Sequence, residues 1–455
     1  MMKKSIMFLL VLTLILGIFS GCGQDADESN DGETASTNSA SENESTTEEK
    51  ITIKFLTWQN HLEEGDNRVV EAYEKENPNV NVVFEYYGDR NVTEYGNKVD
   101  LMIMAGDEMD ILGQAGYGGM AEKAMAGVYY PMDEFIEAEG IEIEDVYSFT
   151  PRVEGSIYGL PADVKSFFVM LNKDLLDAAG LDVPPLDWTW EDYREYAIAM
   201  TQGEGPSKVY GSYFHTWGVY AYLVQFNTQY NNPLSNPDGG FYFDDPALIE
   251  WNKYRKELEN VDGASRPYAD SKAMNANYRT EFFNGQAAMI PTGSWMIPEV
   301  DDIDKYPHDF VTTFAPLPRW SDGGTEGLTN TDSHFYSIAA HSKHPEEAYK
   351  FLRFYTTEGM EIRGGGLSAE VGVDKMEMVK SLMDIPELYD IEALGNVLNN
   401  PEWKDNIITY APPYGAALDT MVIEEAEKYY LDVITAEELV ENWVRNAERI
   451  EEDNE

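Results

Sequence analysis

The sequence predicts an α/β protein of two or three domains, preceded by a targeting segment and a polar tether. Three observations predict this. The chain has 455 residues, whereas a typical domain has roughly 100–200. Its folded part opens with strands that alternate with helices over short links, which is the pattern of a parallel sheet. Its middle and its end show helical periodicity and many aromatic residues.

The first 22 residues have the composition of an export signal. Lys3 and Lys4 precede an apolar run at residues 6–19, and Ser20-Gly21 leads directly into Cys22. This is the order of a secretory signal, and the run is too short for a comfortable membrane span. Small residues before a cysteine resemble the lipobox of bacterial lipoproteins, although Phe19 replaces the usual Leu. We therefore expect a lipid (palmitate) on Cys22 and a protein held at the outer face of the cytoplasmic membrane.

Residues 23–50 contain no large apolar side chain and consist mainly of Ser, Thr, Asn, Asp and Glu. Such a segment cannot bury enough surface to fold. We expect a disordered acidic tether.

The folded region begins with a βαβ pattern. Short apolar runs rich in β-branched and aromatic residues alternate with segments of helical periodicity. The predicted elements are strands at residues 51–58, 79–87 and 110–112 and helices at residues 68–76 and 99–105.

The remainder of the chain is more helical. The clearest predicted helices lie at residues 190–200, 247–258 and 278–283, and apolar residues recur at helical spacing over residues 418–450. Thr435 and Glu438 have the spacing of a capping box, so we expect a helix to begin there.

The composition excludes several classes of protein. The formal charge is −51, from 83 acidic and 32 basic residues, and such a surface repels nucleic acid. One cysteine allows no internal disulfide, and the six histidines show no zinc-binding spacing. We expect no metal and no cofactor.

Four segments, in order, resemble the extracellular solute-binding proteins of family 1, which include the maltose-binding proteins. They read ITIKFLTWQN leading to EAYEKENPNVNVVFEY, GSIYGLPADVKSFFVMLNKDLLDAAGLDVPPLDWTWEDY, FFNGQAAMIPTGSW, and SIAAHSKHPEEAYKFLRFYTTEG. Their order and spacing extend the resemblance over roughly residues 50–450.

The resemblance implies a two-lobed α/β fold of the periplasmic-binding-protein type (type II), with a ligand cleft between lobes joined by several strands. The chain would cross between lobes near residues 161–165, 311–315 and 362. Lobe 1 would then comprise residues 51–162 and about 313–362, and lobe 2 would comprise residues about 163–312 and 363–455.

The resemblance also implies a function. The chain would be the monomeric substrate-binding component of a bacterial ABC importer, would deliver its ligand to separate permease subunits, and would catalyse no reaction. Nine Trp and 29 Tyr favour a carbohydrate, and more specifically an oligosaccharide, because aromatic rings stack on the apolar faces of sugars.

Candidate ligand-binding residues combine this chemistry with the resembling motifs. Trp295 stands in the Gly-x-Trp motif and is the leading candidate. Asp163 and Lys165 follow the Tyr-Gly-Leu-Pro turn, and hinge or turn structure is an equal alternative for Asp332 and its neighbour His334. The full set is Trp58, Asn60, Gln114, Tyr117, Asp163, Lys165, Trp217, Trp295, Asp332 and Tyr414.

Three weaker motifs carry other interpretations. Gly116-Tyr-Gly-Gly-Met-Ala121 fits a dinucleotide loop, but we interpret these glycines as a turn that lets the backbone approach a ligand. Residues 236–245 offer oxygen donors for calcium without the spacing of an EF-hand. Tyrosine pairs at residues 86–87, 129–130 and 429–430 would suit ferric ion.

Two other functions remain open at this point. An extracellular glycosidase would also use carboxylate pairs in an aromatic cleft, but the resemblance leaves no further domain for catalysis. The same fold could bind a peptide, a polyamine or another solute. An anionic ligand would need clustered Arg or Lys, which are sparse in this sequence.

Overall fold

The first lobe is built on a sheet of five strands in which the predicted βαβ pattern is confirmed. β1 pairs in parallel with β2 on one side and β3 on the other, whereas β10 runs antiparallel between β3 and β4. In spatial order the strands are β2 (Val80–Tyr86), β1 (Ile51–Thr57), β3 (Ile111–Gln114), β10 (Phe335–Ile338) and β4 (Leu160–Pro161).

The computed structural model describes residues 50–62, 65–88, 90–227, 232–320, 328–364, 366–381, 383–399 and 404–454. These residues all belong to one compact unit. The predicted signal, Cys22 and the predicted tether up to residue 49 lie outside the described residues. None of the helices in the described ranges has the length and apolar composition that a membrane span needs.

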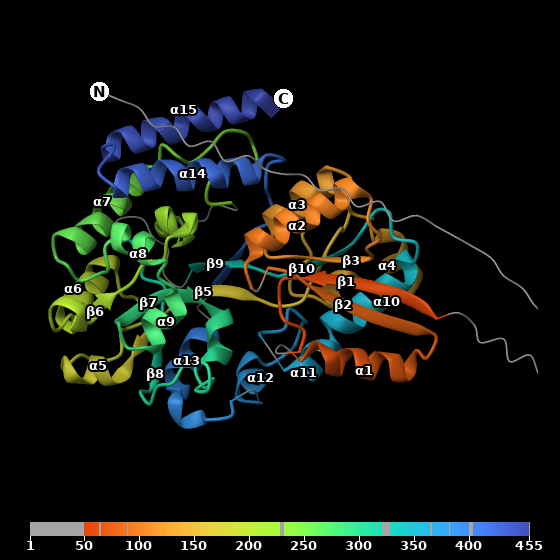
Figure 1. The fold of residues 1–455 in the computed structure, drawn as a ribbon, viewed down its shortest axis with the longest axis horizontal. Coiled ribbons are helices and arrows are strands. Elements are labelled where there is room, and N and C mark those ends of the chain that lie inside the picture. Colours follow the sequence, from red (N-terminus) through yellow and green to blue (C-terminus); the bar gives the residue numbers. More distant parts are fainter. Residues whose placement is uncertain are drawn as a thin grey trace, which may run out of the picture. The chain divides into compact units, whose positions relative to one another are not determined.

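Helices flank this first sheet (Figure 1). They are α1 (Asp66–Glu76), α2 (Val92–Ala105), α3 (Tyr117–Met125), α4 (Asp133–Glu139), α10 (Pro345–Thr356) and α11 (Glu358–Arg363). Helix α2 begins seven residues before the predicted start at residue 99, because Asn91 Oδ1 accepts hydrogen bonds of 3.1 Å from the N–H groups of Thr93 and Glu94. This cap starts the helix in a polar turn where apolar periodicity is absent.

The second lobe has a sheet of six strands centred on β5, which pairs antiparallel with β7, β8 and β9. The strands are β11 (Lys404–Ile407), β9 (Leu328–Asp332), β5 (Lys165–Asn172), β7 (Ala287–Gly293) and β6 (Tyr210–Ser212), with β8 (Thr312–Pro316) also on β5.

The helices of the second lobe confirm the helical interpretation of its sequence. Helices α6 and α9 have the predicted bounds, and the predicted stretch 418–450 is two helices separated by a turn in which Asp432 has φ 61°. The capping box is confirmed, since Glu438 N–H donates to Thr435 Oγ1 and Thr435 N–H to Glu438 Oε2. The helices are α5 (Lys173–Ala178), α6 (Trp190–Met200), α7 (Pro246–Asn260), α8 (Tyr268–Met274), α9 (Tyr278–Phe283), α12 (Lys375–Ser381), α13 (Ile391–Leu398), α14 (Gly415–Tyr430) and α15 (Ala436–Asn454).

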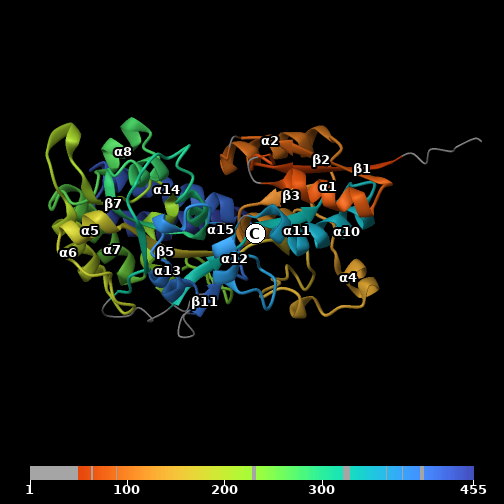
Figure 2. The same cartoon turned by 90° about the horizontal axis from the view of Figure 1, so that it is seen from below.

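The chain passes between the two sheets at places that strand pairing defines. The first passage lies between β4 and β5, at residues 162–164, inside the predicted segment 161–165. The second lies between β9 and β10, at residues 333–334, about twenty residues after the predicted segment 311–315, because β8 and β9 both still pair with β5. The third follows α11 and leads through α12 to α13, which packs against β8. Figure 2 shows β5 within the second lobe and α12 near the middle of the molecule.

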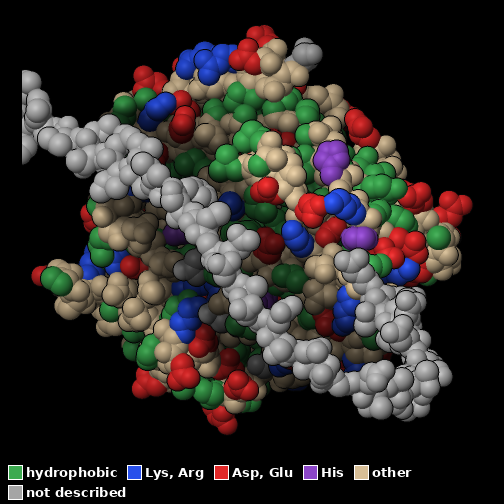
Figure 3. All heavy atoms as spheres, turned by 45° about the vertical axis from the view of Figure 1, so that its right-hand side comes forward, with side chains coloured by type: hydrophobic (Ala, Val, Ile, Leu, Met, Phe, Trp, Pro, Cys, Tyr) green, Lys and Arg blue, Asp and Glu red, His purple; other side chains and the backbone are tan. Residues whose placement is uncertain are grey.

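Acidic side chains are spread over the face shown in Figure 3 instead of gathering in one patch. This distribution agrees with the strongly negative formal charge of −51.

One glycine of the first sheet connects the fold to the wall of a cavity described below. A Cβ atom on Gly113 in β3 would lie 2.8 Å from Trp58 Cζ3 and 3.2 Å from Tyr336 Cε1. Both neighbours are buried, so neither ring can move aside at little cost. The absence of a side chain at Gly113 therefore fixes where the Trp58 indole packs.

We predict that Gly113→Ala lowers the free energy of unfolding by about 1–3 kcal/mol, because the added methyl group overpacks this core. The matched control is Gly96→Ala in α2, where a Cβ would meet nothing within 4 Å. That control should be neutral or stabilising by up to about 1 kcal/mol. Denaturant unfolding of both variants checks the prediction, and a wild-type midpoint for Gly113→Ala would contradict it.

Candidate functional site

A cavity of about 710 Å³ opens between the two lobes. Its volume is in the range of pockets that bind small molecules. Lobe 1 contributes the loops that follow the carboxyl ends of β1, β2 and β3, which is where open α/β sheets place their ligands. Lobe 2 contributes residues around η5 (Ser294–Glu299), the 3₁₀ helix that follows β7.

On the wall of lobe 1, Trp58 follows β1 directly and is only 4% exposed. Its ring meets His334 edge-on at 4.9 Å between centroids and lies 5.4 Å from the ring of Tyr95. The indole therefore lines the cavity through a small edge while the core fixes its orientation.

Gln59 is held in one orientation by the groups behind it. Its Oε1 accepts hydrogen bonds from Arg363 Nη2 at 2.9 Å and from the Tyr336 hydroxyl at 3.2 Å. Arg363 in turn lies 3.1 Å from the buried Asp66 carboxylate, which also accepts a bond from the Tyr355 hydroxyl. Because the amide oxygen is occupied, Gln59 offers the cavity its NH₂ group, which can only donate.

The passages between the lobes are joined by backbone hydrogen bonds. The N–H of Ala162 donates to His334 O at 3.0 Å, and the N–H of Val164 donates to Leu367 O at 2.7 Å. The segments of all three passages thus lie side by side at the floor of the cavity.

Asp163 is a buried carboxylate at this junction. Its Oδ1 accepts the N–H of His334 at 2.9 Å, and its Oδ2 lies 2.8 Å from Lys165 Nζ and 3.2 Å from His334 Nδ1. Burial alone would raise the pKa of Asp163, but His334 and Lys165 outweigh it and lower that pKa below its ordinary value. Burial lowers the pKa of His334, and Lys165 Nζ lies closer to the carboxylate than the His334 ring does.

The wall of lobe 2 is aromatic. The Trp217 ring lies 5.0 Å from Tyr278 and 6.4 Å from Trp295, and the Trp295 ring meets Phe167 edge-on at 5.2 Å. Trp217 is 41% exposed, which leaves much of its ring available to a solute.

The Gly-x-Trp motif has a steric reason in this wall. A Cβ atom on Gly293 would lie 2.0 Å from Trp295 Cζ3. The indole therefore folds back over Gly293, and any other residue at that position would displace it. This explains why a glycine stands two residues before the candidate stacking ring.

Charged residues form the outer part of the lobe 2 wall. Arg279 Nε lies 2.7 Å from both carboxylate oxygens of Glu299. Arg90 of lobe 1 reaches toward the same carboxylate, with its Nη1 at 3.8 Å, so this pair bridges the two lobes. Burial raises the pKa of Glu299 in spite of Arg279.

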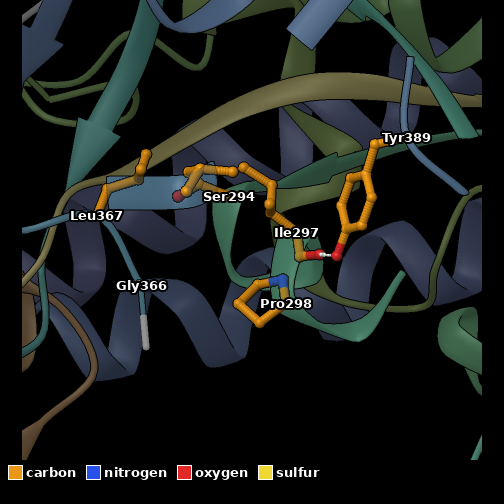
Figure 4. Close-up of a pocket in the computed structure, with 7 residues that line it drawn as sticks. Ser294, Ile297, Pro298, Gly366, Leu367 and Tyr389 are labelled. Carbon is orange, nitrogen blue, oxygen red and sulfur yellow. Dashed lines mark hydrogen bonds between the residues drawn. The ribbon is translucent and has the colours of Figure 1, made fainter. Parts of the chain in front are cut away.

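A much smaller space of about 10 Å³ lies beside the large cavity, behind the junction (Figure 4). Ser294 Oγ donates to Val164 O at 2.8 Å. The Tyr389 hydroxyl donates to Ile297 O at 3.0 Å, a bond that Figure 4 marks. This volume is at most enough for one water molecule. We interpret it as a packing gap between the third passage and η5.

The structure brings five of the ten predicted residues together around the large cavity. Three come from lobe 2 or its edge and two from lobe 1 or the junction. They are Trp58, Asp163, Lys165, Trp217 and Trp295.

The other five lie outside the cavity lining. Asn60 is half-buried, and its Oδ1 accepts the N–H of Leu62 at 3.2 Å. Gln114 is buried at the end of β3. The Tyr117 hydroxyl donates to Arg152 O at 3.2 Å, and the Tyr414 hydroxyl donates to Glu451 Oε1 at 2.9 Å.

Asp332, the fifth, occupies the glycine turn that we had expected to approach a ligand. Its Oδ1 accepts the N–H groups of Tyr117 at 2.9 Å and Ser333 at 2.8 Å. A Cβ on Gly116 would lie 2.7 Å from Asp332 Oδ2. Gly116 therefore leaves room for the Asp332 carboxylate at the start of α3, in place of a ligand. Asp332 itself stands directly before the second passage between the lobes.

Sequence reasoning missed several lining residues: Gln59, Arg68, Arg90, Tyr278, Arg279, Glu299 and Arg363. Gln59 had a signal, because it follows Trp58 at the end of a strand. The arginines had none, since Arg68, Arg279 and Arg363 lie on helices, where a polar residue predicts only a solvated face.

Two sheets that are joined by several passages, with a cavity between them, define the class of two-lobed solute-binding proteins. The comparisons agree. The sequence matches the family of bacterial extracellular solute-binding proteins over residues 59–362, and the chain belongs to this family. The family consists of transport components that bind solutes, so the prediction of a binding protein is confirmed and the glycosidase alternative is set aside.

Individual relatives are distant. The chain is 23% identical to the multiple sugar-binding protein of Streptococcus mutans over 320 residues, which cover 68% of this chain and 72% of that protein. An ABC substrate-binding protein of Listeria monocytogenes, solved with cycloalternan, shares 21% identity with a TM-score of 0.71 over 87% of this chain and 97% of its own. UgpB of Mycobacterium tuberculosis, solved with glycerophosphocholine, shares 17% identity with a TM-score of 0.72 over 89% and 99%. These structures show the two-lobed fold.

Asp332 predicts a pH dependence of stability. Burial raises its pKa from 3.8 to about 7, so between these values the folded state holds a proton that the unfolded state has released. Stability therefore falls as the pH rises through this interval. We predict that Asp332→Asn, which is uncharged and keeps an acceptor, removes this part of the decline.

Denaturant unfolding at several pH values between 4 and 8 measures the effect. The control is Asp270→Asn, which changes an exposed carboxylate on α8 and should leave the wild-type pH dependence in place. If Asp332→Asn declines in parallel with the wild type, the buried carboxylate is not its source.

Proposed function

We propose that this chain is the carbohydrate-binding component of a bacterial ABC importer. The observation that carries the proposal is the aromatic wall of lobe 2, where Trp217, Tyr278 and Trp295 face the polar groups of lobe 1 across one cavity. Aromatic faces suit the apolar faces of pyranose rings, while hydrogen-bonding groups suit the hydroxyls. The sugar-binding relatives support the same choice.

An oligosaccharide fits better than a single ring. The cavity of about 710 Å³ has stacking rings at Trp217 and Trp295, whose centroids are 6.4 Å apart. Trp58 adds an aromatic edge on the opposite wall. Rings that are spread over both walls can contact more than one sugar residue.

Binding would act through a population shift. A solute in this cavity contacts both lobes most fully when the walls approach each other, so it stabilises the closed arrangement. The passages at residues 162–164 and 333–334 are the places where such a hinge would bend. The closed form would then deliver the solute to the permease subunits in the membrane.

The N-terminal segment extends the proposal to location. Cys22 after Ser20-Gly21 is the lipidation site, residues 23–50 are the tether, and the folded body stays at the outer face of the cytoplasmic membrane. The extracellular character of the family supports this arrangement.

A thermal-shift screen tests the ligand class, because a ligand of the native state raises the melting temperature. The full chain is heated with mono- and oligosaccharides, and with amino acids, polyamines and peptides as controls. A rise with a saccharide series supports the proposal. If the melting temperature rises only with a peptide or a polyamine, the ligand class is wrong, whereas the assignment as a solute-binding protein stands.

We predict that Trp295→Ala weakens saccharide binding by about tenfold or more, equivalent to about 1.4 kcal/mol, because the ring that stacks on the sugar is lost. Isothermal titration calorimetry measures the affinity. The control is Tyr414→Phe, which removes a hydroxyl bonded to Glu451 outside the cavity and should change nothing. Unchanged affinity in Trp295→Ala would remove this ring from the site.

We also predict that Cys22→Ala releases the chain from the membrane fraction, because the lipid needs the cysteine sulfur. Fractionation of cells that express the variant, with detection of the chain in each fraction, measures this. A variant that stays with the membrane would show that another feature anchors the chain.

A further inference from the structure

We propose that the saccharide carries an anionic group, a carboxylate or a phosphate, which binds to the wall of lobe 1. This inference rests on the proposed function and adds the charge of the ligand to it. It starts from the distribution of charge around the cavity.

The two walls of the cavity have opposite charge. The part contributed by lobe 1 includes Arg68, Arg90 and Arg363, and the carboxylate nearest to it among the described lining residues is Asp163 at the junction, which Lys165 pairs at 2.8 Å. The whole chain has 83 acidic and 32 basic residues, so this selection runs against the composition. Arg363 is paired with the buried Asp66, and Arg90 reaches Glu299. Arg68 therefore adds the positive charge that no carboxylate of the described residues offsets, and it raises the local potential at this wall.

The polar groups of this wall are mainly hydrogen-bond donors. Arg68 Nη2 donates to the backbone oxygen of Arg363, which holds the two arginines next to each other. Gln59 has its amide oxygen occupied by Arg363 and Tyr336. Within the described part of the chain, Arg68 forms no ion pair with a carboxylate, and its side chain is exposed.

A wall of hydrogen-bond donors favours a ligand group that only accepts hydrogen bonds. The hydroxyls of a neutral sugar both donate and accept, so their hydrogens would find few acceptors on this wall. Carboxylates and phosphates accept several bonds at once and pair with guanidinium groups in a bidentate manner. Lys165 lies at the edge of the same surface, with its charge compensated by Asp163.

The carboxylates of lobe 2 do not cancel this preference. Glu299 is paired with Arg279, and Asp301 Oδ2 accepts the N–H groups of Asp384 at 2.7 Å and Ile385 at 3.1 Å. Asp302 is half-buried, and its Oδ1 accepts the N–H of Lys305 at 3.3 Å. Asp304 and Asp384 are exposed at the rim and remain solvated. An anionic group can therefore lie against lobe 1 while the sugar rings lie against Trp217 and Trp295.

Isothermal titration calorimetry with matched ligands tests the inference on the full chain. Trigalacturonate is compared with galactotriose for a carboxylate, and glucose 6-phosphate is compared with glucose for a phosphate. We expect at least one acidic ligand to bind tenfold or more tightly than its neutral partner, with an affinity that falls as salt is added. The acidic ligand that binds identifies which anion the wall accepts.

Two variants assign the effect to lobe 1. Arg68→Gln should lower the affinity for the acidic ligand about tenfold and leave the affinity for its neutral partner within about twofold. The matched control is Arg449→Gln in α15, which does not line the cavity and should leave both affinities unchanged.

The outcomes separate the two proposals. The inference of an anionic group is wrong if neither acidic ligand binds more tightly than its neutral partner, or if Arg68→Gln weakens the binding of both equally. The proposal of a carbohydrate ligand is then still decided by the thermal-shift screen. If no saccharide binds in that screen while a peptide or a polyamine does, the proposed function is wrong, and this inference fails with it.

Discussion

The buried carboxylate of Asp163 is the interaction on which the cavity depends. It lies on the first passage between the lobes, accepts the N–H of His334 on the second, and stands beside Gly366 on the third, where a Cβ would lie 3.7 Å from Asp163 Oδ2. Lys165 compensates its charge at 2.8 Å. Loss of one partner from such a buried pair typically costs about 3–5 kcal/mol. Asp163 thus couples the polar floor of the cavity to the segments that must bend.

The two walls of the cavity differ in the chemistry of their side chains. Lobe 2 presents rings whose positions are fixed by packing, with Trp295 folded over Gly293. Lobe 1 presents donors whose positions are fixed by hydrogen bonds behind them, with Gln59 held by Arg363. The contact of Arg90 with Glu299 at 3.8 Å links the rims. A solute that needs both surfaces binds best when they are close, which is how this arrangement would join recognition to closure.

The sequence predicted local structure well, because local patterns determine it. Helices α6 and α9 follow from apolar periodicity, and the start of α15 follows from its capping box. Trp58 follows from its place at a strand end, and Trp295 follows from the Gly-x-Trp motif. The second passage could not be located in this way, since it depends on β8 and β9 pairing with β5, far away in the chain. The arginine wall was missed for the same reason. Arg68 and Arg363 are almost three hundred residues apart and meet only because α1 and α11 pack together.

The most direct test of the central claim is hydrogen–deuterium exchange of the full chain with and without a saccharide that binds. If the solute lies between the lobes, protection should increase in the loop after β1 around Trp58, at the junction around Asp163, and in η5 around Trp295. Protection confined to one lobe, or to segments outside the cavity, would contradict the claim that both walls hold the solute.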